Sequence, residues 1–337
     1  MIMGALVMAL LAQFVTLPYV LLRPGPAVDI LGTPEEGAPV VTIEGAETYP
    51  TEGALYFTTV AQYGGPGRRP TAWDVARAAL DPHSDVVPEE RIFPPDVTRE
   101  QMQERQSAMM TDSKEEAVAV ALRALGRDVT ETAQVAQVMP DMPAQGRLEV
   151  NDIITAVDGE DVTRAPQIAE RITASTSDVT LTVIRGDETL QVELSPRERD
   201  GRRLVGVLIQ PRFEYGVDVQ IQAGNVGGPS AGMMFALGVY DTLTPGALTG
   251  GEQIAGTGSI DSTGQVGAIG GVPQKLTGAR DAGASFFLTP RDNCHEVPGN
   301  VPDGLTVTPV TTFEESVAAV EAIASGDSAD LPRCPGT

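Results

Sequence analysis

One serine in this sequence stands in a setting that suits nucleophilic chemistry. Ser230 lies within Gly228-Pro229-Ser230-Ala231-Gly232, and residues 231–240 form a continuous apolar run of helical length. Glycine and proline exclude a regular helix before the serine, so Ser230 is expected where a loop enters a buried helix. Backbone N–H groups at a helix start lack intrahelical acceptors, and they can stabilise the oxyanion formed when serine attacks a carbonyl carbon. The alternative is a serine that only caps a core helix.

A lysine further along the chain offers a base for this serine. Only two of the 23 basic residues are lysines, Lys114 and Lys275. Lys275 follows Pro273 in a glycine-rich loop that is typical of a helix start, where the helix dipole disfavours positive charge. Lowering a lysine pKa from about 10.4 to about 7 costs on the order of 4 to 5 kcal/mol, which burial among apolar neighbours can supply. Arginine cannot be tuned in this way, so the choice of lysine here favours a general base over a solvated surface cation.

Several motifs in order and at the expected spacing carry a resemblance to a known family. The stretch from about Val207 to Ala324 resembles the proteolytic domain of the Lon family of serine peptidases, through segments 225–232, 255–260, 264–275 and 282–290. The resemblance implies that Ser230 is the nucleophile and Lys275 the general base, and that Thr257 offers its hydroxyl to the lysine amine. It also implies substrate or oxyanion contacts from Asn225 and from the N–H groups around Gly228 and Ser230.

Two departures from the family pattern bear on mechanism. Many Lon enzymes carry an acidic residue three places before the serine, where this chain has Gly227. The sequence also contains no Walker A motif, so no ATP motor is expected and substrates would have to arrive unfolded, flexible or as short tails.

The pentapeptide around Ser230 also fits G-x-S-x-G, the nucleophile elbow of α/β-hydrolases. That interpretation requires a downstream acid and histidine, for which Asp261 and His295 are the candidates. The many strands that precede the elbow in α/β-hydrolases are lacking, and His295 lies in a polar loop. A Ser/His hydrolase is therefore the weaker alternative.

A second module precedes the serine region. Strand patterns at 132–138 and 153–159, a helix pattern at 165–172 and a hairpin at 179–194 resemble a bacterial PDZ domain over about 128–197. PDZ domains bind an extended C-terminal peptide as an added strand, so this module would present substrate tails. The groove is expected along Ala133–Val138, with Leu125-Gly126 as the nearest candidate for a carboxylate-binding loop. A module that merely packs on the protease is the alternative.

The region between the N-terminus and this module carries no recognisable chemistry. Residues 54–60 have a strand pattern, which we interpret as the first strand of the PDZ-like sheet, and residues 72–80 and 99–125 have helix patterns inserted after it. The helix at 99–125 is amphipathic in its C-terminal half.

The first 22 residues contain no charged side chain and are long enough to cross a bilayer as a helix. We interpret them as an uncleaved anchor, with a cleaved signal peptide as the alternative.

The two cysteines, Cys294 and Cys334, are what a single disulfide needs, and such bonds persist outside the cytoplasm. The expected localisation is therefore a single-pass protein of the cell membrane with its catalytic part extracytoplasmic.

The composition and motifs together give one hypothesis. A net charge of −23 argues against nucleic-acid partners, and no metal site or cofactor is indicated. The fold class is α/β and α+β multidomain. The expected parts are an anchor at 1–22, a segment with a strand and helices at 23–127, a PDZ-like domain at 128–200, a Lon-type serine protease domain at 201–326 and a tail at 327–337. The chain is similar to ATP-independent, PDZ-containing Lon-type serine endopeptidases that Gram-positive bacteria and actinobacteria place outside the membrane. Protein or peptide substrates are the expected partners, and since Lon domains often form hexameric rings, a homo-oligomer is implied by fold analogy alone. The rival function is an anchored PDZ adaptor whose Lon-like domain is not catalytic.

Overall fold

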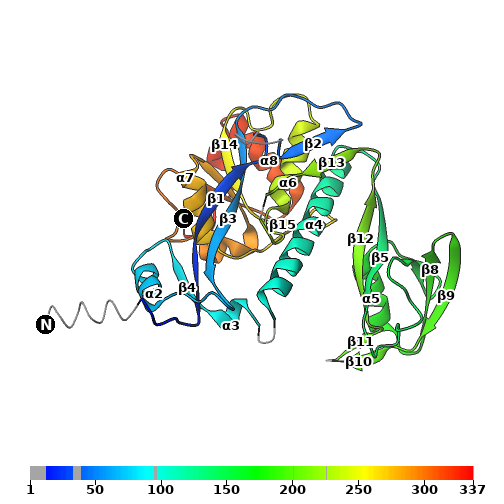
Figure 1. Ribbon diagram of the computed structural model, residues 1–337. Coiled ribbons are helices and arrows are strands. Elements are labelled where there is room, and N and C mark those ends of the chain that lie inside the picture. Colours follow the sequence, from blue (N-terminus) through cyan, green and yellow to red (C-terminus); the bar gives the residue numbers. More distant parts are fainter. Residues whose placement is uncertain (1–12, 33–38, 95–96, 200, 225, 337) are drawn as a thin grey trace. The chain divides into compact units, whose positions relative to one another are not determined.

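The chain folds into two compact units, and one is inserted into the sequence of the other (Figure 1). The computed structural model describes residues 13–32, 39–94, 97–199, 201–224 and 226–336. Unit 1 joins residues 1–126 to residues 217–337, and unit 2 comprises residues 127–216. Residues 217–326 of the protease region expected at 201–326 therefore belong to a unit to which the N-terminal third of the chain also contributes, whereas residues 201–216 belong to unit 2.

Unit 1 is built on a six-stranded mixed sheet in the order β18-β17-β14-β3-β1-β4. Strands β3, β14, β17 and β18 run parallel to one another, and β1 pairs antiparallel with both β3 and β4. Their bounds are Tyr19–Asp29 for β1, Ala54–Gly64 for β3, Asp85–Pro88 for β4, Gln253–Gly256 for β14, Phe286–Pro290 for β17 and Thr306–Val310 for β18. Two short antiparallel pairs complete the unit, β2 (Val41–Glu44) with β13 (Asp218–Ile221) and β15 (Ser259–Ile260) with β16 (Val266–Gly267).

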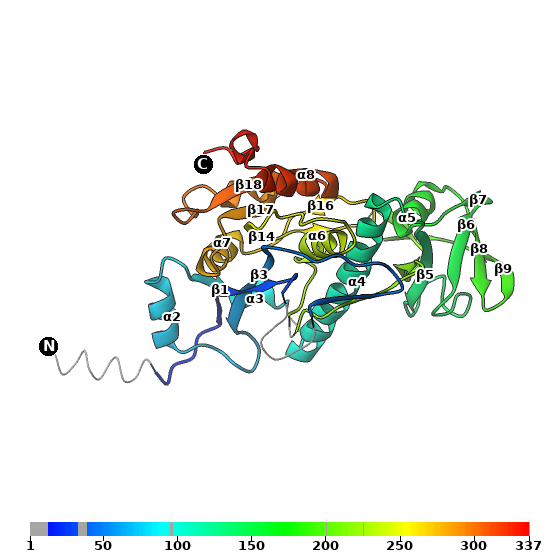
Figure 2. The same ribbon diagram turned by 90° about the horizontal axis from the view of Figure 1, so that it is seen from above.

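Helices cover both faces of this sheet (Figure 2). Helix α7 (Val272–Asp281) packs against β1 and β3, whereas α6 (Gly232–Thr242) contacts β3 on the opposite face and packs against α4 (Arg99–Ala124) and α8 (Phe313–Ala324). Nearly every side chain of α6 is buried, as its continuous apolar sequence requires. The remaining elements are α2 (Ala72–Ala79), α3 (Glu89–Ile92), η1 (Arg291–Glu296) and η2 (Ser328–Asp330).

The N-terminal strand pattern belongs to unit 1, not to the PDZ-like sheet. Residues 54–60 lie in β3, near the centre of the unit 1 sheet, where β14 pairs with β3 on one side and β1 on the other. The long helix α4 is likewise part of unit 1, since it packs against α6. The interpretation of this region as a PDZ strand with inserted helices was wrong, because β3 finds its partner strand about 200 residues later.

The proposed anchor extends too far in the C-terminal direction. Residues 1–12 lie outside the described residues, but Tyr19–Leu22 form the start of β1, with Val20 and Leu21 fully buried in the sheet. A helix through residue 22 is therefore excluded. Among the residues that the structure describes, no helix is long and apolar enough to span a membrane.

Unit 2 is an antiparallel sheet in the order β12-β5-β6-β8-β9, with one helix packed on it. The side chains of α5 join those of the sheet in a single apolar core. The elements are β5 (Thr130–Val138), β6 (Ile153–Val157), β7 (Glu160–Asp161), α5 (Ala165–Ala174), β8 (Val179–Arg185), β9 (Glu188–Leu194), β10 (Arg197–Arg199), β11 (Arg202–Leu204) and β12 (Val207–Glu214).

Candidate active site

Ser230 lies in the turn that leads into α6, two residues before the helix begins. The N-cap is Ala231, and the helix start carries no side-chain capping hydrogen bond. Ser230 is therefore not a helix cap, and its half-buried side chain is free for another purpose. Among the described residues, the N–H groups of Ser230 and Ala231 have no hydrogen-bond acceptor.

The turn before Ser230 is held by helix α4, an element for which the sequence analysis predicts no chemistry. The N–H of Gly228 donates to the carbonyl of Gln106 at 2.9 Å, and the hydroxyl of Ser113 donates to the carbonyl of Pro229 at 3.1 Å. Ser113 is buried beside Gly232, where an added Cβ would lie 2.6 Å from the serine oxygen. The Gly228 N–H, expected to face substrate, is therefore already used to fix the turn and cannot bind an oxyanion.

Lys275 occupies the first turn of α7 and is almost completely buried, with 2% of its surface exposed. Its ammonium is deprived of water, and this burial lowers the lysine pKa from 10.5 to about 7, against a smaller opposing effect of the Glu296 carboxylate. The helix starts after Gly271, which has a positive φ of 75° and is followed by proline in the first turn. This tight start directs the lysine side chain into the interior of unit 1.

Thr257 connects the lysine to the serine turn. The Lys275 Nζ donates to the Thr257 hydroxyl at 2.9 Å, and that hydroxyl donates to the carbonyl oxygen of Ser230 at 2.9 Å. The N–H of Gly258 donates to the same carbonyl at 2.8 Å. A neutral amine that donates one hydrogen to Thr257 keeps a lone pair, which can accept the proton of another hydroxyl.

Ser230 and Lys275 line one pocket of about 460 Å³. Its other walls come from residues 57–62 of β3 and from Gln106 of α4. Among the described strands, β14 pairs with β3 only as far as Phe57, so the edge at 59–62 is open toward the pocket. Asn225, the remaining predicted contact, lies outside the described residues.

The loop that leads to Lys275 is fastened from the C-terminal part of the chain. The Asn293 side chain accepts from the Ile269 N–H at 2.9 Å and donates to the Ile269 carbonyl at 2.8 Å. Cys294 forms a disulfide with Cys334, the pairing that the sequence predicts. Because Cys334 is buried in the core around α7, the C-terminal segment expected as a tail at 327–337 is fastened to unit 1 through this residue.

The structure does not assemble the Ser/His alternative. The His295 side chain is 75% exposed in η1 and does not line the Ser230 pocket. The carboxylate of Asp261 accepts from the backbone N–H groups of Thr263 and Gln265, which makes it a turn residue between β15 and β16.

In unit 2, the expected peptide groove was assigned to the wrong strand. Strand β5 is an inner strand, paired with β12 on one side and β6 on the other, so Ala133–Val138 offers no open edge. The edge strand is β12, and a pocket of about 150 Å³ lies between β12 and α5, lined by Ile168, Ile172 and Val207 among others. Leu125-Gly126 ends helix α4 in unit 1, with Gly126 at a positive φ of 71°.

The loop before β12 is better suited to bind a carboxylate. It consists of Val205 and Gly206, whose carbonyls accept from the N–H groups of Ala144 and Met139. The N–H groups of Val205 and Gly206 have no acceptor among the described residues. The sequence signal was present in Leu204-Val205-Gly206-Val207, but it lies after the predicted end of the module at 200.

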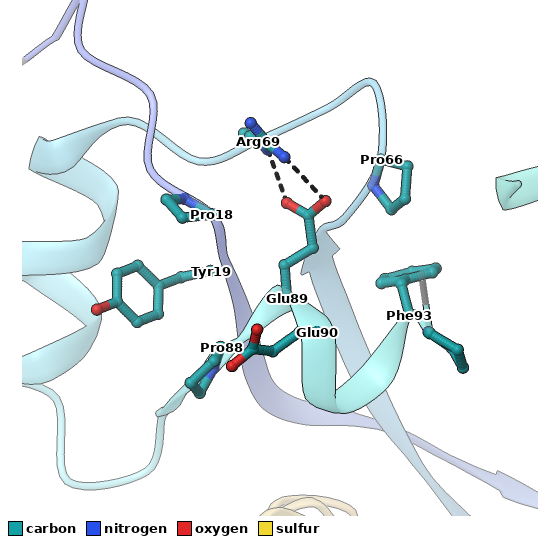
Figure 3. A pocket seen from close by; sticks show the side chains of 9 residues that line it. Pro18, Tyr19, Pro66, Arg69, Pro88, Glu89, Glu90 and Phe93 are labelled. Atoms are coloured by element: carbon teal, nitrogen blue, oxygen red, sulfur yellow. Dashed lines mark hydrogen bonds and ion pairs between the residues drawn. The ribbon is translucent and has the colours of Figure 1, made fainter. Parts of the chain in front are cut away.

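A further pocket in unit 1, of about 560 Å³, has no serine, threonine, cysteine or lysine among its lining residues (Figure 3). Proline rings, Tyr19 and Phe93 line it, and the Arg69 guanidinium contacts both oxygens of the Glu89 carboxylate. This pocket shares no lining residue with that of Ser230.

Two protein families match parts of this chain. Residues 208–322 match the Lon protease (S16) C-terminal proteolytic domain, and residues 107–195 match the PDZ domain. The chain thus contains a Lon-type serine peptidase domain and a PDZ domain. Both matched ranges differ from the structural units, since residues 107–124 lie in α4 of unit 1 and residues 208–214 in β12 of unit 2.

Two Lon proteases are among the relatives to which parts of this chain are similar. Lon protease 2 of Herpetosiphon aurantiacus is 37% identical over 146 residues, which cover 40% of this chain and 17% of that protein. Lon protease 1 of Bacillus subtilis is 34% identical over 105 residues, covering 29% of this chain and 13% of that protein. The chain spans less than a fifth of the length of these relatives. A solved PDZ domain of an SdrC-like protein from Listeria monocytogenes is 22% identical and covers 23% of this chain and 85% of that one, at a TM-score of 0.22.

Proposed function

We propose that this chain is a membrane-anchored serine endopeptidase that works without an ATPase, with Ser230 as nucleophile and Lys275 as general base. The observation that carries this proposal is the buried amine of Lys275, whose pKa of about 7 keeps a large fraction neutral, in the same pocket as Ser230. A general base acts best when its pKa lies near the working pH. An adaptor without catalysis would gain nothing from so costly a group.

The reaction follows the acyl-transfer pattern of serine peptidases. The neutral Lys275 Nζ takes the proton of the Ser230 hydroxyl as its oxygen attacks the peptide carbonyl. The N–H groups of Ser230 and Ala231 then stabilise the oxyanion, and the lysine ammonium gives its proton to the leaving amine. Water activated by the same amine hydrolyses the acyl-enzyme. Thr257 holds the amine in position, because its hydroxyl is itself fixed by the Ser230 carbonyl.

The substrate binds in an extended conformation along the open edge of β3. Residues 59–62 of that strand lie in the pocket beside Ser230 and have no strand partner on that side among the described residues. Backbone hydrogen bonds to such an edge hold a peptide regardless of its side chains. An unfolded segment can therefore enter, whereas a folded protein cannot.

Unit 2 delivers substrates by their C-terminal tails. A tail pairs with β12, its carboxylate meets the N–H groups of Val205 and Gly206, and its last side chain enters the pocket formed with Ile168 and Ile172. This delivery compensates for the missing unfolding motor, because a tethered tail raises the local concentration of flexible substrate.

We place the catalytic part outside the cytoplasm. The Cys294–Cys334 disulfide supports this localisation, since such bonds persist in oxidising compartments. The uncharged, mostly apolar sequence of residues 1–12, directly before the described part of the chain, supports attachment of the N-terminus to a membrane, although at about 1.5 Å per residue these twelve residues alone are shorter than a span of about 30 Å.

The test is hydrolysis of a short unstructured peptide by the purified chain. Ser230→Ala and Lys275→Met are expected to abolish cleavage, while His295→Ala, a matched change at an exposed basic residue outside the pocket, leaves it intact. The value of kcat/KM should rise about tenfold per pH unit below pH 7 and level off above it, because only the deprotonated lysine acts as a base. Full activity in Lys275→Met, or a flat profile between pH 5 and 9, would refute the dyad.

A further inference from the structure

Unit 1 exposes a group of large apolar side chains at the point where the described chain begins. Phe14, Val15, Trp73 and Leu80, here called the N-terminal patch, are 81%, 52%, 44% and 87% exposed. Single exposed apolar residues are common on protein surfaces, but a group of them marks a contact.

The backbone holds Phe14 and Val15 beside the start of α2, the helix that carries Trp73 and ends at Leu80. The Ala72 N–H donates to the Val15 carbonyl at 2.7 Å. Phe14 precedes Val15 and Trp73 follows Ala72, so each is the sequence neighbour of a residue in this hydrogen bond. Thr16 and Thr71 form an antiparallel bridge next to it. The N-terminal segment is therefore fastened to the start of α2.

Helix α2 presents the other half of the patch on one face. Trp73 and Leu80 are seven residues apart, which places them on the same side of the helix and about 10 Å apart along it. Arg77 lies between them on this face, and Ala78 on the other side is buried. A capping box between Thr71 and Asp74 fixes the helix start, so the patch is a preformed surface.

The composition of this face fits the boundary region of a lipid bilayer. Tryptophan is enriched at the level of lipid headgroups, where its ring is buried and its N–H stays hydrated. An arginine beside it can extend its guanidinium to the phosphates while its methylene groups cover apolar surface. The twelve residues before Gln13 carry no charge and lead directly into Phe14 and Val15.

We infer that the N-terminal patch inserts into the headgroup region of the membrane that holds residues 1–12, with a lipid bilayer as its partner. The inference rests on the proposed membrane anchor and goes beyond it. An anchor alone is a flexible tether, whereas a second contact through α2 fixes the face that unit 1 turns to the membrane.

Trp73 is the only tryptophan of the chain, so its fluorescence reports on this patch alone. The full chain is mixed with vesicles of phosphatidylcholine and phosphatidylglycerol, with and without lipids brominated near the headgroup, and recovered by flotation. The expected result is that the chain floats and that its emission shifts to shorter wavelength and is quenched by brominated lipid. Leu80→Ser should reduce the quenching, while Val150→Ser, a matched change at a residue 55% exposed in unit 2, should leave it unchanged.

The outcomes separate the two proposals. A chain that floats but keeps an unquenched tryptophan retains its anchor and overturns the inference about the patch. A chain that does not float overturns both. A shift to shorter wavelength that brominated lipid cannot quench means that protein covers the patch, which identifies a second copy as the partner and overturns the inference.

Discussion

The burial of Lys275 makes a quantitative prediction about stability. In the unfolded chain its pKa is 10.5, and in the folded chain it is about 7. At pH 7 the folded state must therefore hold a lysine that is about half neutral and that would be almost fully charged in water, which costs about 4 kcal/mol. Lys275→Met removes this cost while keeping a side chain of similar length, so the inactive variant should be more stable than the wild type at pH 7.

The pH dependence identifies the cause. Between pH 7 and 10.5 the unfolded state binds more protons than the folded state, so wild-type stability rises with pH in this window relative to the variant. From pH 7 to pH 9.5 the difference in unfolding free energy should shrink by about 3 kcal/mol. Other titrating groups cancel, because both proteins share them.

The assay is a denaturant titration followed by the emission of Trp73, which reports on unit 1. Lys114→Met is the matched control, since Lys114 is the other lysine and is less buried. The difference in unfolding free energy between the wild type and Lys114→Met should change less between pH 7 and pH 9.5 than the difference for Lys275→Met. A Lys275→Met variant that is less stable at pH 7, or whose difference from wild type stays constant up to pH 9.5, would refute the neutral lysine and with it the base.

Three more outcomes are expected from the site and the fold. Ser113→Ala leaves the Pro229 carbonyl without its side-chain partner, at a cost of about 1 to 2 kcal/mol, so kcat should fall roughly tenfold in steady-state kinetics while KM changes little; an unchanged kcat would show that α4 does not position the turn. Replacing Cys294 and Cys334 by serine opens a loop of about 40 residues and should lower unfolding free energy by about 4 kcal/mol, measured by denaturation, and an unchanged midpoint would contradict this. Ile172→Glu should slow cleavage of a protein with a flexible C-terminal tail but not of a short peptide, and equal losses on both would exclude unit 2 as the receptor.

The positions of the candidate site residues could be predicted from the sequence because these residues lie in short local motifs. Ser230 and Lys275 each stand in a glycine-rich turn before a helix, and such turns have a recognisable composition. The lysine pKa could also be anticipated, since burial is the main physical cause of such a shift. The hydrogen bond of Thr257 to Lys275 agrees with the role that the family resemblance implies.

The surroundings of the site could not be predicted, because they depend on contacts between distant segments. The Thr58 hydroxyl donates to the Gly256 carbonyl across 198 positions in the sequence, and no local pattern records this pairing. A strand pattern at 54–60 predicts a strand but not its partner. The error in the PDZ groove has a similar origin, since β12, the edge strand, follows the predicted end of the module and pairs back to β5.

The insertion point of unit 2 explains why α4 lies beside the turn that carries Ser230. The chain enters unit 2 from the end of α4 and leaves it just before β13. Helix α4 holds the Gly228 N–H and the Pro229 carbonyl, and β13 is followed within a few residues by the turn that carries Ser230. Both connections to the inserted unit thus lead directly to the elements that shape one turn. The buried hydroxyl of Ser113, placed against Gly232 of α6, is one of the contacts that join α4 to α6 beside the turn that carries Ser230.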